Sequence, residues 1–199
     1  MKKSKVLVLF ETSGGVSVPF REAGFDVTTV DILPHRVDNE HHVCCDIWDI
    51  DKLNLNFEEF DLLIAFPPCT YFSKAGLHYL HKQPLRKYKQ ARDLVLIKML
   101  WSLPIKYKCF ENPEGSALKK LWQMPSCKID YRDYADFAKP TCLWLENLPP
   151  LLPEQINYKK YGAFITRMGS SNKFKKSKTP IEVGYAMVKQ WGQIIHRGG

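Results

Sequence analysis

The first half of the chain alternates short, nearly continuous apolar runs with stretches that have the spacing of amphipathic helices. The apolar runs cover Val6 to Phe10, Phe25 to Ile32, Phe60 to Phe66 and Tyr107 to Phe110. Strands that read as apolar runs, without regular polar alternation, are typical of parallel sheets covered by helices on both faces. These four segments are therefore predicted to be buried strands of such a sheet.

Three segments carry helical signals. An amphipathic stretch follows the first strand as far as Ala23, and Gly24 ends it. Residues 86–103 place apolar side chains on one side at helical spacing, and a third helix is expected over residues 180–195, opened by a proline that suits a first turn. Alternating strands and helices indicate the α/β class, so the predicted fold is a Rossmann-like, doubly wound, mostly parallel sheet.

The length of 199 residues fits one compact domain, predicted to span residues 1–199. The part from about 116 to 180 is rich in proline and is predicted to be irregular. No run approaches the roughly 20 apolar residues that span a bilayer. The run after the basic start is too short for a signal-peptide core, so we expect no membrane association and a cytoplasmic location.

Cysteine usage and charge add two constraints. The six cysteines form no Cys-x-x-Cys pair and the histidines complete no zinc pattern, so no metal site is predicted. A chain of this length can build its core without disulfides, so we expect free thiols. The formal net charge of +8 is compatible with a polyanionic partner such as nucleic acid but does not establish one.

Glycine and acidic residues follow the first two strands, at the edge where doubly wound folds bind ligands. The turn from Phe10 to Gly15 can bring the backbone close to a ligand at a helix N-terminus. Asp31 ends the second strand, where α/β folds hold ribose hydroxyls, and Asp46 could accept a hydrogen bond from an adenine amino group. The alternatives are an ordinary turn, a helix-facing aspartate and a helix N-cap.

Two further strand ends carry candidate reactive groups. Pro67 and Pro68 force a rigid, extended exit from the third strand and present Cys69 at the carboxyl edge of the sheet, where a thiolate can act as a nucleophile. Glu111 is expected at the same edge, which suits a general acid beside a nucleophile. The alternatives are a buried structural cysteine, which the rigid turn argues against, and a surface carboxylate in a turn.

Two basic groups could contact phosphate. One is a polar loop before the last helix and comprises Arg167, Lys173, Lys175, Lys176 and Lys178. The other surrounds the start of the predicted middle helix and comprises Lys82, Arg86, Lys87, Lys89 and Arg92. The first could equally be a solvated loop, and the second simply the exposed face of a helix.

In their order along the chain, these motifs resemble those of the cytosine-5 DNA methyltransferases. The turn from Phe10 to Gly15 resembles the first S-adenosylmethionine motif, Phe-x-Gly-x-Gly-Gly, and Asp46 resembles the aspartate that contacts adenine. Residues Pro67 to Gly76 are similar to the catalytic Pro-Cys loop, and Glu111-Asn112 to the Glu-Asn-Val motif. The stretch from Lys139 to Pro149 resembles small, often phage-encoded, methylase-like proteins.

The resemblance implies the fold of the S-adenosylmethionine-dependent methyltransferases, with S-adenosylmethionine as the cofactor. Cys69 would be the nucleophile, and Glu111 would protonate or hydrogen-bond N3 of cytosine. The residues implied in cofactor binding are Phe10, Thr12, Gly14, Gly15, Asp31, Asp46 and Pro67. The residues implied in substrate binding are Pro68, Ser73, Asn112, Arg167, Lys175, Lys176 and Lys178.

The chain also departs from the family pattern. Thr12 replaces the first glycine of the cofactor loop, Thr70 replaces the glutamine after the nucleophile, and Pro113 replaces the valine of Glu-Asn-Val. The family's Gln-x-Arg-x-Arg motif, whose second arginine helps to hold the target base, is not found, and Arg132 and Arg167 are the candidate substitutes. Residues 116–180 are too few for a normal target-recognition domain.

Three functions remain open on the sequence alone. The leading hypothesis is methyl transfer to carbon 5 of cytosine in DNA, within a bacterial or phage-infected cell. The second is the same chemistry on a free pyrimidine nucleotide or RNA, which the missing recognition domain favours. The third is a non-catalytic nucleic-acid-binding homologue, which Thr12 and Thr70 favour. The sequence sets no oligomeric state.

Overall fold

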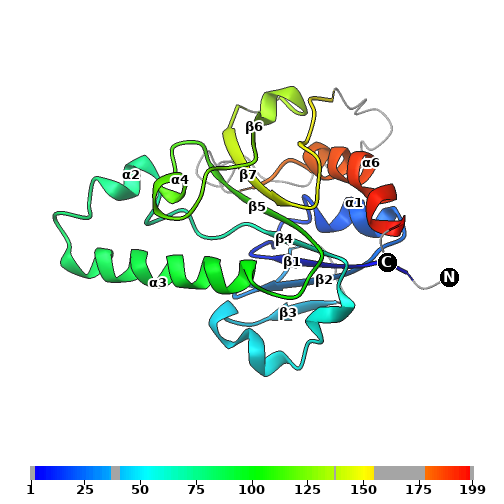
Figure 1. Ribbon diagram of the computed structural model, residues 1–199, viewed down its shortest axis with the longest axis horizontal. Helices are drawn as coiled ribbons and strands as arrows, with labels where there is room; N and C mark the ends of the chain where they lie inside the picture. The colour runs from blue at the N-terminus through cyan, green and yellow to red at the C-terminus, as the bar shows by residue number, and fades with distance from the viewer. Residues whose placement is uncertain (1–2, 37–40, 137, 155–177, 198–199) are drawn as a thin grey trace.

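A seven-stranded sheet forms the centre of the protein (Figure 1). The computed structural model describes residues 3–36, 41–136, 138–154 and 178–197. The strands lie in the order β3-β2-β1-β4-β5-β7-β6. All neighbours pair in parallel except β7, which runs antiparallel to both β5 and β6. The strand bounds are β1 (Lys5–Leu9), β2 (Asp26–Asp31), β3 (His42–Cys44), β4 (Leu62–Ala65), β5 (Tyr107–Pro113), β6 (Cys127–Asp130) and β7 (Pro140–Glu146).

Helices cover both faces of this sheet, because successive side chains of a strand point to opposite sides. On one face Val6 and Val8 join a core with α1 and α6, and on the other Leu7 and Leu9 join a core with α3. The helices are α1 (Ser17–Glu22), α2 (Lys74–Leu77), α3 (Pro84–Trp101), α4 (Leu118–Leu121) and α6 (Ile181–Arg197). The 3-10 segments are η1 (Ile47–Leu53), η2 (Phe57–Glu59) and η3 (Tyr131–Asp133).

The predicted α/β class and doubly wound, mostly parallel sheet are confirmed. The four predicted strands correspond to β1, β2, β4 and β5, and the three predicted helices to α1, α3 and α6. Gly24 ends α1 with φ of 91°, a left-handed conformation that glycine adopts at little cost. The apolar pattern was therefore sufficient to identify four of the five parallel strands, all except the short edge strand β3.

The prediction that residues 116–180 are irregular is wrong for the part that the structure describes. This region contributes β6 and β7, which extend the sheet beyond β5. Trp144 of β7 is fully buried and stacks near Trp122, 6.0 Å between ring centroids. The prolines misled the interpretation, because Pro140 is the first residue of β7, a position where a strand tolerates proline.

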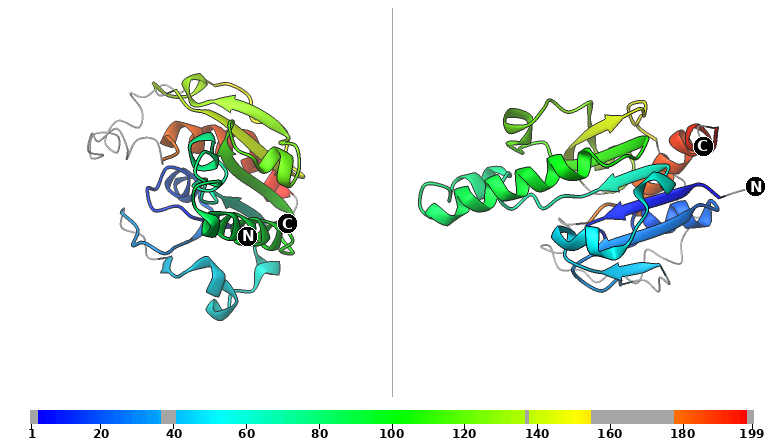
Figure 2. Two further views of the ribbon diagram at one scale, coloured as in Figure 1. Left: turned by 90° about the vertical axis from the view of Figure 1, so that its left-hand side faces the viewer. Right: turned by 60° about the horizontal axis from the view of Figure 1, so that its bottom comes forward.

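Helix α3 extends beyond the sheet: its N-terminal half projects away from the strands together with α2 (Figures 1 and 2). Only the part nearer its C-terminus is buried against the strands, through Leu96, Ile97 and Leu100. The helix pair therefore projects from the body of the protein.

The six cysteines are free thiols, as predicted. Within residues 3–36, 41–136, 138–154 and 178–197, no helix combines the length and the apolar character that crossing a membrane requires.

Helix α6 packs closely against the turn after β1. The space beside Gly184 is so small that a Cβ there would lie 2.3 Å from the carbonyl oxygen of Gly15 and 2.8 Å from Pro19. Gly192 lies in the same helix, but a Cβ there would meet only ordinary contacts, the nearest being the Phe25 ring at 3.6 Å. The C-terminal helix is thus held against α1 by backbone approach as well as by apolar side chains.

Gly184→Ala should lower the free energy of unfolding by about 1–3 kcal/mol, because the extra methyl group meets backbone that cannot move aside cheaply. Gly192→Ala is the matched control and should be neutral or slightly stabilising, since alanine favours a helix over glycine. Urea unfolding of both variants measures the difference. Equal midpoints for the two variants would contradict this account of the packing.

Candidate active site

The carboxyl ends of β1, β4 and β5 meet at one edge of the sheet, and the predicted reactive groups lie there. Strands β4 and β5 pair in parallel with Ala65 opposite Phe110. The next residue of β5 is Glu111, so it lies level with the first residue after β4. The sheet register therefore brings the Cys69 loop and Glu111 to the same edge, as the sequence predicts.

Two prolines and a tight turn shape the loop that carries Cys69. Pro67 is buried, Pro68 is exposed, and Cys69 is partly exposed. The carbonyl oxygen of Cys69 then accepts hydrogen bonds from the backbone N–H groups of Phe72 (3.0 Å) and Ser73 (2.8 Å). The thiol therefore sits on a rigid turn at the sheet edge.

The loop closes directly onto α2. Ser73 is the N-cap of this helix, since its Oγ accepts a hydrogen bond from the backbone N–H of Gly76 at 3.2 Å. A Cβ on Gly76 would lie 1.9 Å from the carbonyl oxygen of Thr70, so only glycine fits there. Because the Ser73 hydroxyl caps α2, its contact with substrate stays a prediction.

Glu111 is buried and forms an ion pair with Lys139, 3.1 Å between Nζ and Oε1. The side chains of both residues are mostly buried, with 7% and 16% exposure respectively. The hydroxyl of Tyr131 also donates to Glu111 Oε1 (3.4 Å) and contacts Thr179 Oγ1 (3.2 Å). Burial raises the pKa of the Tyr131 phenol well above its usual range, so the group stays a neutral donor.

Lys139 is the residue of the candidate site that sequence reasoning did not assign. The two proposed substitutes for the base-holding arginine were Arg132 and Arg167. Arg132 is exposed and binds the carboxylate of Asp130 at 3.0 and 3.3 Å, so the structure does not bring it to Glu111. Arg167 lies outside the described residues. The cation beside Glu111 is Lys139, one residue before β7, and only the strand pairing of β7 with β5 could have identified it.

The surroundings of Cys69 favour the neutral thiol. Burial raises the pKa of this thiol above its ordinary value, and the negative charge of Glu111 raises it further. The charge of Lys139 and a backbone hydrogen bond act in the opposite direction. Cys69, Glu111 and Lys139 are therefore one electrostatically coupled group.

Asn112 links the two loops of the site. Its Nδ2 donates a hydrogen bond to the carbonyl oxygen of Pro67 at 3.0 Å in a buried position. Its Oδ1 is buried and has no hydrogen-bond partner among the described residues. A buried acceptor without a partner costs free energy. Asn112 Oδ1 could therefore accept a hydrogen bond from a bound ligand, which agrees with the predicted role of Asn112 in substrate binding.

The turn after β1 uses unusual backbone conformations. Phe10 has φ of 61° and Gly14 φ of 79°, both in the left-handed region. Thr12, which stands in place of a family glycine, is partly exposed, and its backbone carbonyl oxygen accepts a hydrogen bond from the backbone N–H of Arg36. A Cβ on Gly15 would lie 2.2 Å from the carbonyl oxygen of Thr179. Gly15 therefore has a packing role, whatever its contact with a cofactor.

Two acidic residues predicted to bind the cofactor occupy different settings. Asp31 is half-buried, accepts a hydrogen bond from the backbone N–H of Leu33 (2.8 Å), and has its pKa raised by burial. The apolar side chains that follow it, Ile32 and Leu33, are 66% and 55% exposed. Asp46 is exposed and caps η1 by accepting from the N–H of Trp48 at 3.1 Å, so the N-cap interpretation applies to it.

The predicted phosphate-binding loop is only partly described. Arg167, Lys175 and Lys176 lie outside the described residues. Lys178 is partly exposed. Its pKa is lowered mainly by partial burial and also by the nearby positive charge of Arg36. Its role in substrate binding stays a prediction.

Comparison with known proteins places this arrangement in a family. The family model described as C-5 cytosine-specific DNA methylase matches residues 4–88, which include the Cys69 loop. A curated relative from Frog virus 3 (isolate Goorha), named "Probable DNA (cytosine-5)-methyltransferase", is 30% identical over 158 residues. That alignment covers 71% of this chain and 70% of the relative.

A solved structure supports the fold. The protein, titled "putative DNA modification methyltransferase encoded within prophage" (E. coli), matches with a TM-score of 0.52 at 20% identity. The match covers 78% of this chain and 52% of that one, so the chain spans about half the length of this structural relative. The match to the family model and the 30% identity to the viral protein confirm the predicted enzyme class: the chain belongs to the C-5 cytosine-specific DNA methylase family.

Proposed function

We propose that the protein transfers a methyl group from S-adenosylmethionine to carbon 5 of cytosine in DNA, through a covalent bond between Cys69 and the base. The observation that carries this proposal is the grouping of Cys69, Glu111 and Lys139 at the carboxyl edge of the sheet. A nucleophile and an acid facing one site are what covalent catalysis with proton transfer needs.

The chemistry follows from the residue types. Carbon 5 of cytosine is a poor nucleophile, so the Cys69 thiolate first bonds to carbon 6 and moves electron density toward carbon 5. Glu111 in its protonated form donates a hydrogen bond, or its proton, to ring N3 and so stabilises the negative charge that develops there. After carbon 5 has been alkylated and has lost its proton, the ring double bond reforms and the thiolate leaves. Lys139 orients Glu111 through their ion pair.

The cofactor edge of the sheet fits S-adenosylmethionine, which when bound supplies the methyl group in an activated form. The half-buried carboxylate of Asp31 would hold ribose hydroxyls, and the exposed side chain of Ile32 next to it offers an apolar surface for adenine. The left-handed Phe10 and Gly14 shape the turn that borders this surface. At the same edge, Asp46 would accept a hydrogen bond from the adenine amino group, and Pro67 would contact the cofactor.

The same chemistry on a free pyrimidine nucleotide or on RNA is the alternative, because residues 116–180 are too few for a normal target-recognition domain. Comparing substrates in one assay separates the two. Transfer to nucleoside monophosphate but not to polymer would favour the nucleotide.

Alkylation should report the protonation of Cys69. Because burial and Glu111 raise the pKa of this thiol, its reaction with iodoacetamide should accelerate only as the pH rises above the ordinary thiol range. Glu111→Gln removes the nearby negative charge and should move this pH profile to lower pH, whereas Lys139→Met should move it higher. The rate is measured by mass spectrometry of the peptide that contains Cys69.

The matched control for this experiment is Glu114→Gln, which alters a carboxylate just beyond β5 that pairs with Lys128. It should leave the pH profile of Cys69 unchanged. A profile that does not respond to Glu111→Gln would contradict the electrostatic coupling.

Methyl transfer should depend on Cys69. Tritium transfer from labelled S-adenosylmethionine to DNA should fall by at least about 10³-fold in Cys69→Ala, as expected when a covalent nucleophile is removed. Cys44→Ala alters an exposed thiol on β3 and should keep full activity. Activity that survives Cys69→Ala would rule out the nucleophile assignment.

Cofactor affinity should depend on Asp31. Asp31→Ala should weaken S-adenosylmethionine binding about tenfold, as loss of a hydrogen-bonded charge does, while Asp51→Ala, an exposed carboxylate in η1, should not. Because the pKa of Asp31 is raised by burial, the difference from wild type should shrink as the pH falls and this carboxylate is protonated. Isothermal titration calorimetry measures both effects; equal affinities would contradict the role.

A further inference from the structure

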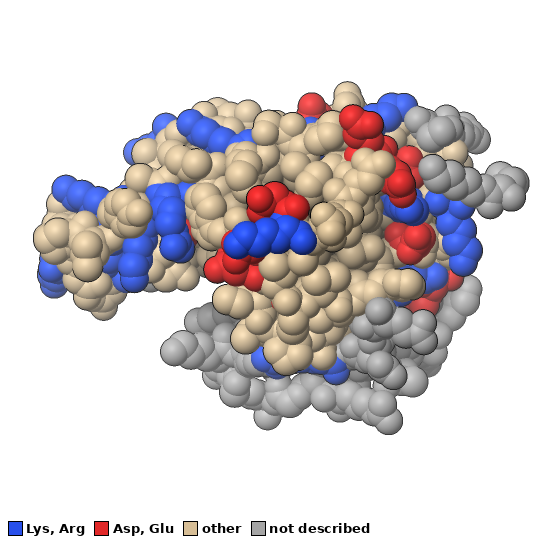
Figure 3. Space-filling model, turned by 90° about the horizontal axis from the view of Figure 1, so that it is seen from below, with Lys and Arg blue, Asp and Glu red and all other residues tan. Residues whose placement is uncertain are grey.

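The projecting helix pair carries most of the excess charge of the protein. We define the arm as residues 74–101, from the start of α2 to the end of α3. It contains seven lysines and arginines against one aspartate, a net charge of +6 in a chain whose total is +8. That aspartate, Asp93, is buried beside Arg92, so the exposed surface of the arm presents cations and no carboxylate. Figure 3 shows these cations gathered at the projecting end.

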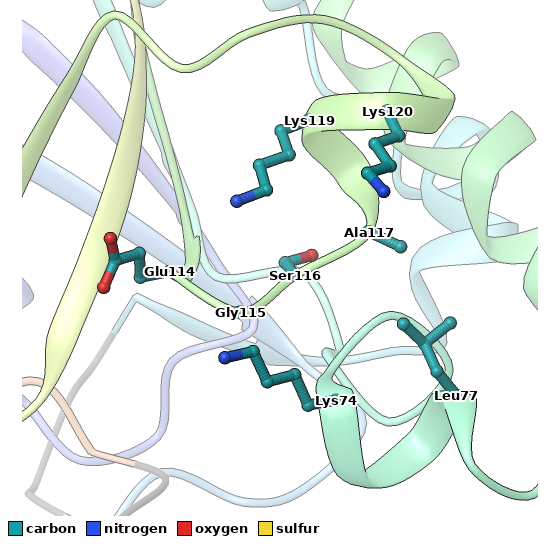
Figure 4. Close-up of a pocket in the computed structure, with 8 residues that line it drawn as sticks. All are labelled: Lys74, Leu77, Glu114, Gly115, Ser116, Ala117, Lys119 and Lys120. Atoms are coloured by element: carbon teal, nitrogen blue, oxygen red, sulfur yellow. The ribbon is translucent and has the colours of Figure 1, made fainter.

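A basic hollow adjoins the arm. It has a volume of about 400 Å³ and lies between α2, the turn after β5 and α4. Lys74, Lys119 and Lys120 line it, and the side chains of Lys74 and Lys119 extend toward the same side of the space, the side of Glu114 (Figure 4). The carboxylate in its wall, Glu114, is paired with Lys128 at 2.9 Å, and this hydrogen bond lowers the Glu114 pKa. Among the described residues, no contact of ion-pair length joins a carboxylate to the three lining lysines, although the charges of Lys119 and Lys74 also lower the Glu114 pKa.

Both features are joined to the Cys69 loop. Lys74 directly follows Ser73, whose N–H is bonded to the Cys69 carbonyl. Arg86 of the arm donates from Nη2 to the carbonyl oxygen of Thr70 at 3.2 Å, and its guanidinium lies over the Tyr71 ring at 4.9 Å. The hollow and the arm therefore both adjoin the loop that carries Cys69.

Resting on the function proposed above, we infer that the hollow and the arm together bind the phosphate backbone of a polynucleotide, and so make a polymer rather than a free nucleotide the substrate. The 18 residues of α3 extend over about 27 Å, at 1.5 Å per residue. A single nucleotide carries its phosphate at one point and could use only the hollow. A strand spaces its phosphates a few ångströms apart and can contact both.

The side chains between the cations suit the same partner. Tyr79 and Tyr88 are 47% and 68% exposed on the arm. Lysine and arginine interleaved with exposed aromatic rings is a pattern that contacts phosphates and stacks on bases. The arm would therefore supply contacts to the polynucleotide that a separate target-recognition domain would otherwise make.

The test is fluorescence anisotropy of labelled 20-nucleotide DNA, single-stranded and duplex, with the full chain between 50 and 300 mM salt. Lys87→Glu with Lys89→Glu reverses two exposed lysines of the arm. This double variant should weaken binding at least about tenfold and reduce the slope of log K against log salt by about 2, one for each phosphate contact. Lys119→Ala with Lys120→Ala should act in the same direction through the hollow.

The matched control is Lys3→Glu with Lys106→Glu, which changes the net charge equally at the start of β1 and just before β5, at the opposite edge of the sheet. It should change affinity less than threefold. Equal losses in the arm and control variants, or a change in oligomeric state in place of DNA affinity, would overturn the inference. So would a wild-type protein that binds no polynucleotide at 50 mM salt.

The outcome is separable from that of the proposed function. Arm-dependent DNA binding without methyl transfer would contradict the enzyme activity and leave the binding surface standing. Methyl transfer to a free nucleotide, with no binding of DNA or RNA, would support the chemistry of Cys69 and overturn the binding surface.

Discussion

The hydrogen bond from the Asn112 side chain to the carbonyl oxygen of Pro67, 3.0 Å long and buried, joins the two strand ends on which the candidate chemistry depends. Parallel pairing of β4 and β5 brings these ends to the same level, but pairing alone does not fix the loops beyond them. The two prolines stiffen one loop, and the amide of Asn112 holds it to the other strand. The Cys69 turn and Glu111 therefore keep a defined separation before any ligand arrives, which limits the ordering that binding must impose.

Burial at this edge has two opposing effects. It strengthens the attraction between Lys139 and Glu111, since charges interact more strongly away from water. It also disfavours the thiolate of Cys69 and leaves a neutral thiol at rest. Lys139 is the group that offsets this penalty, because its charge acts on both Glu111 and Cys69. The positive charge of Lys139 thus stabilises the ionised forms of Glu111 and Cys69, two groups whose negative charges would repel each other.

Local sequence signals were sufficient for the parts of the site that lie at the ends of predicted strands. Cys69 follows an apolar run and two prolines, and Glu111 ends another apolar run, so topology alone places both at one edge. Lys139 gives no such signal, since its position depends on β7 pairing antiparallel to β5, a contact between segments distant in sequence. Proline-rich composition concealed β7 itself. Similarly, Gly15 suggested a cofactor loop, whereas its close contact is the carbonyl oxygen of Thr179.

Gly76 shows what a recognisable motif can encode. Its lack of a side chain is required by the carbonyl oxygen of Thr70, 1.9 Å from where a Cβ would lie. The Ala-Gly pair that makes the loop recognisable is therefore informative about chain geometry and carries no chemical information about the reaction. A homologue could keep this glycine and lose its catalytic cysteine without changing shape, so the motif without the thiol would identify the fold of the loop but not an enzyme.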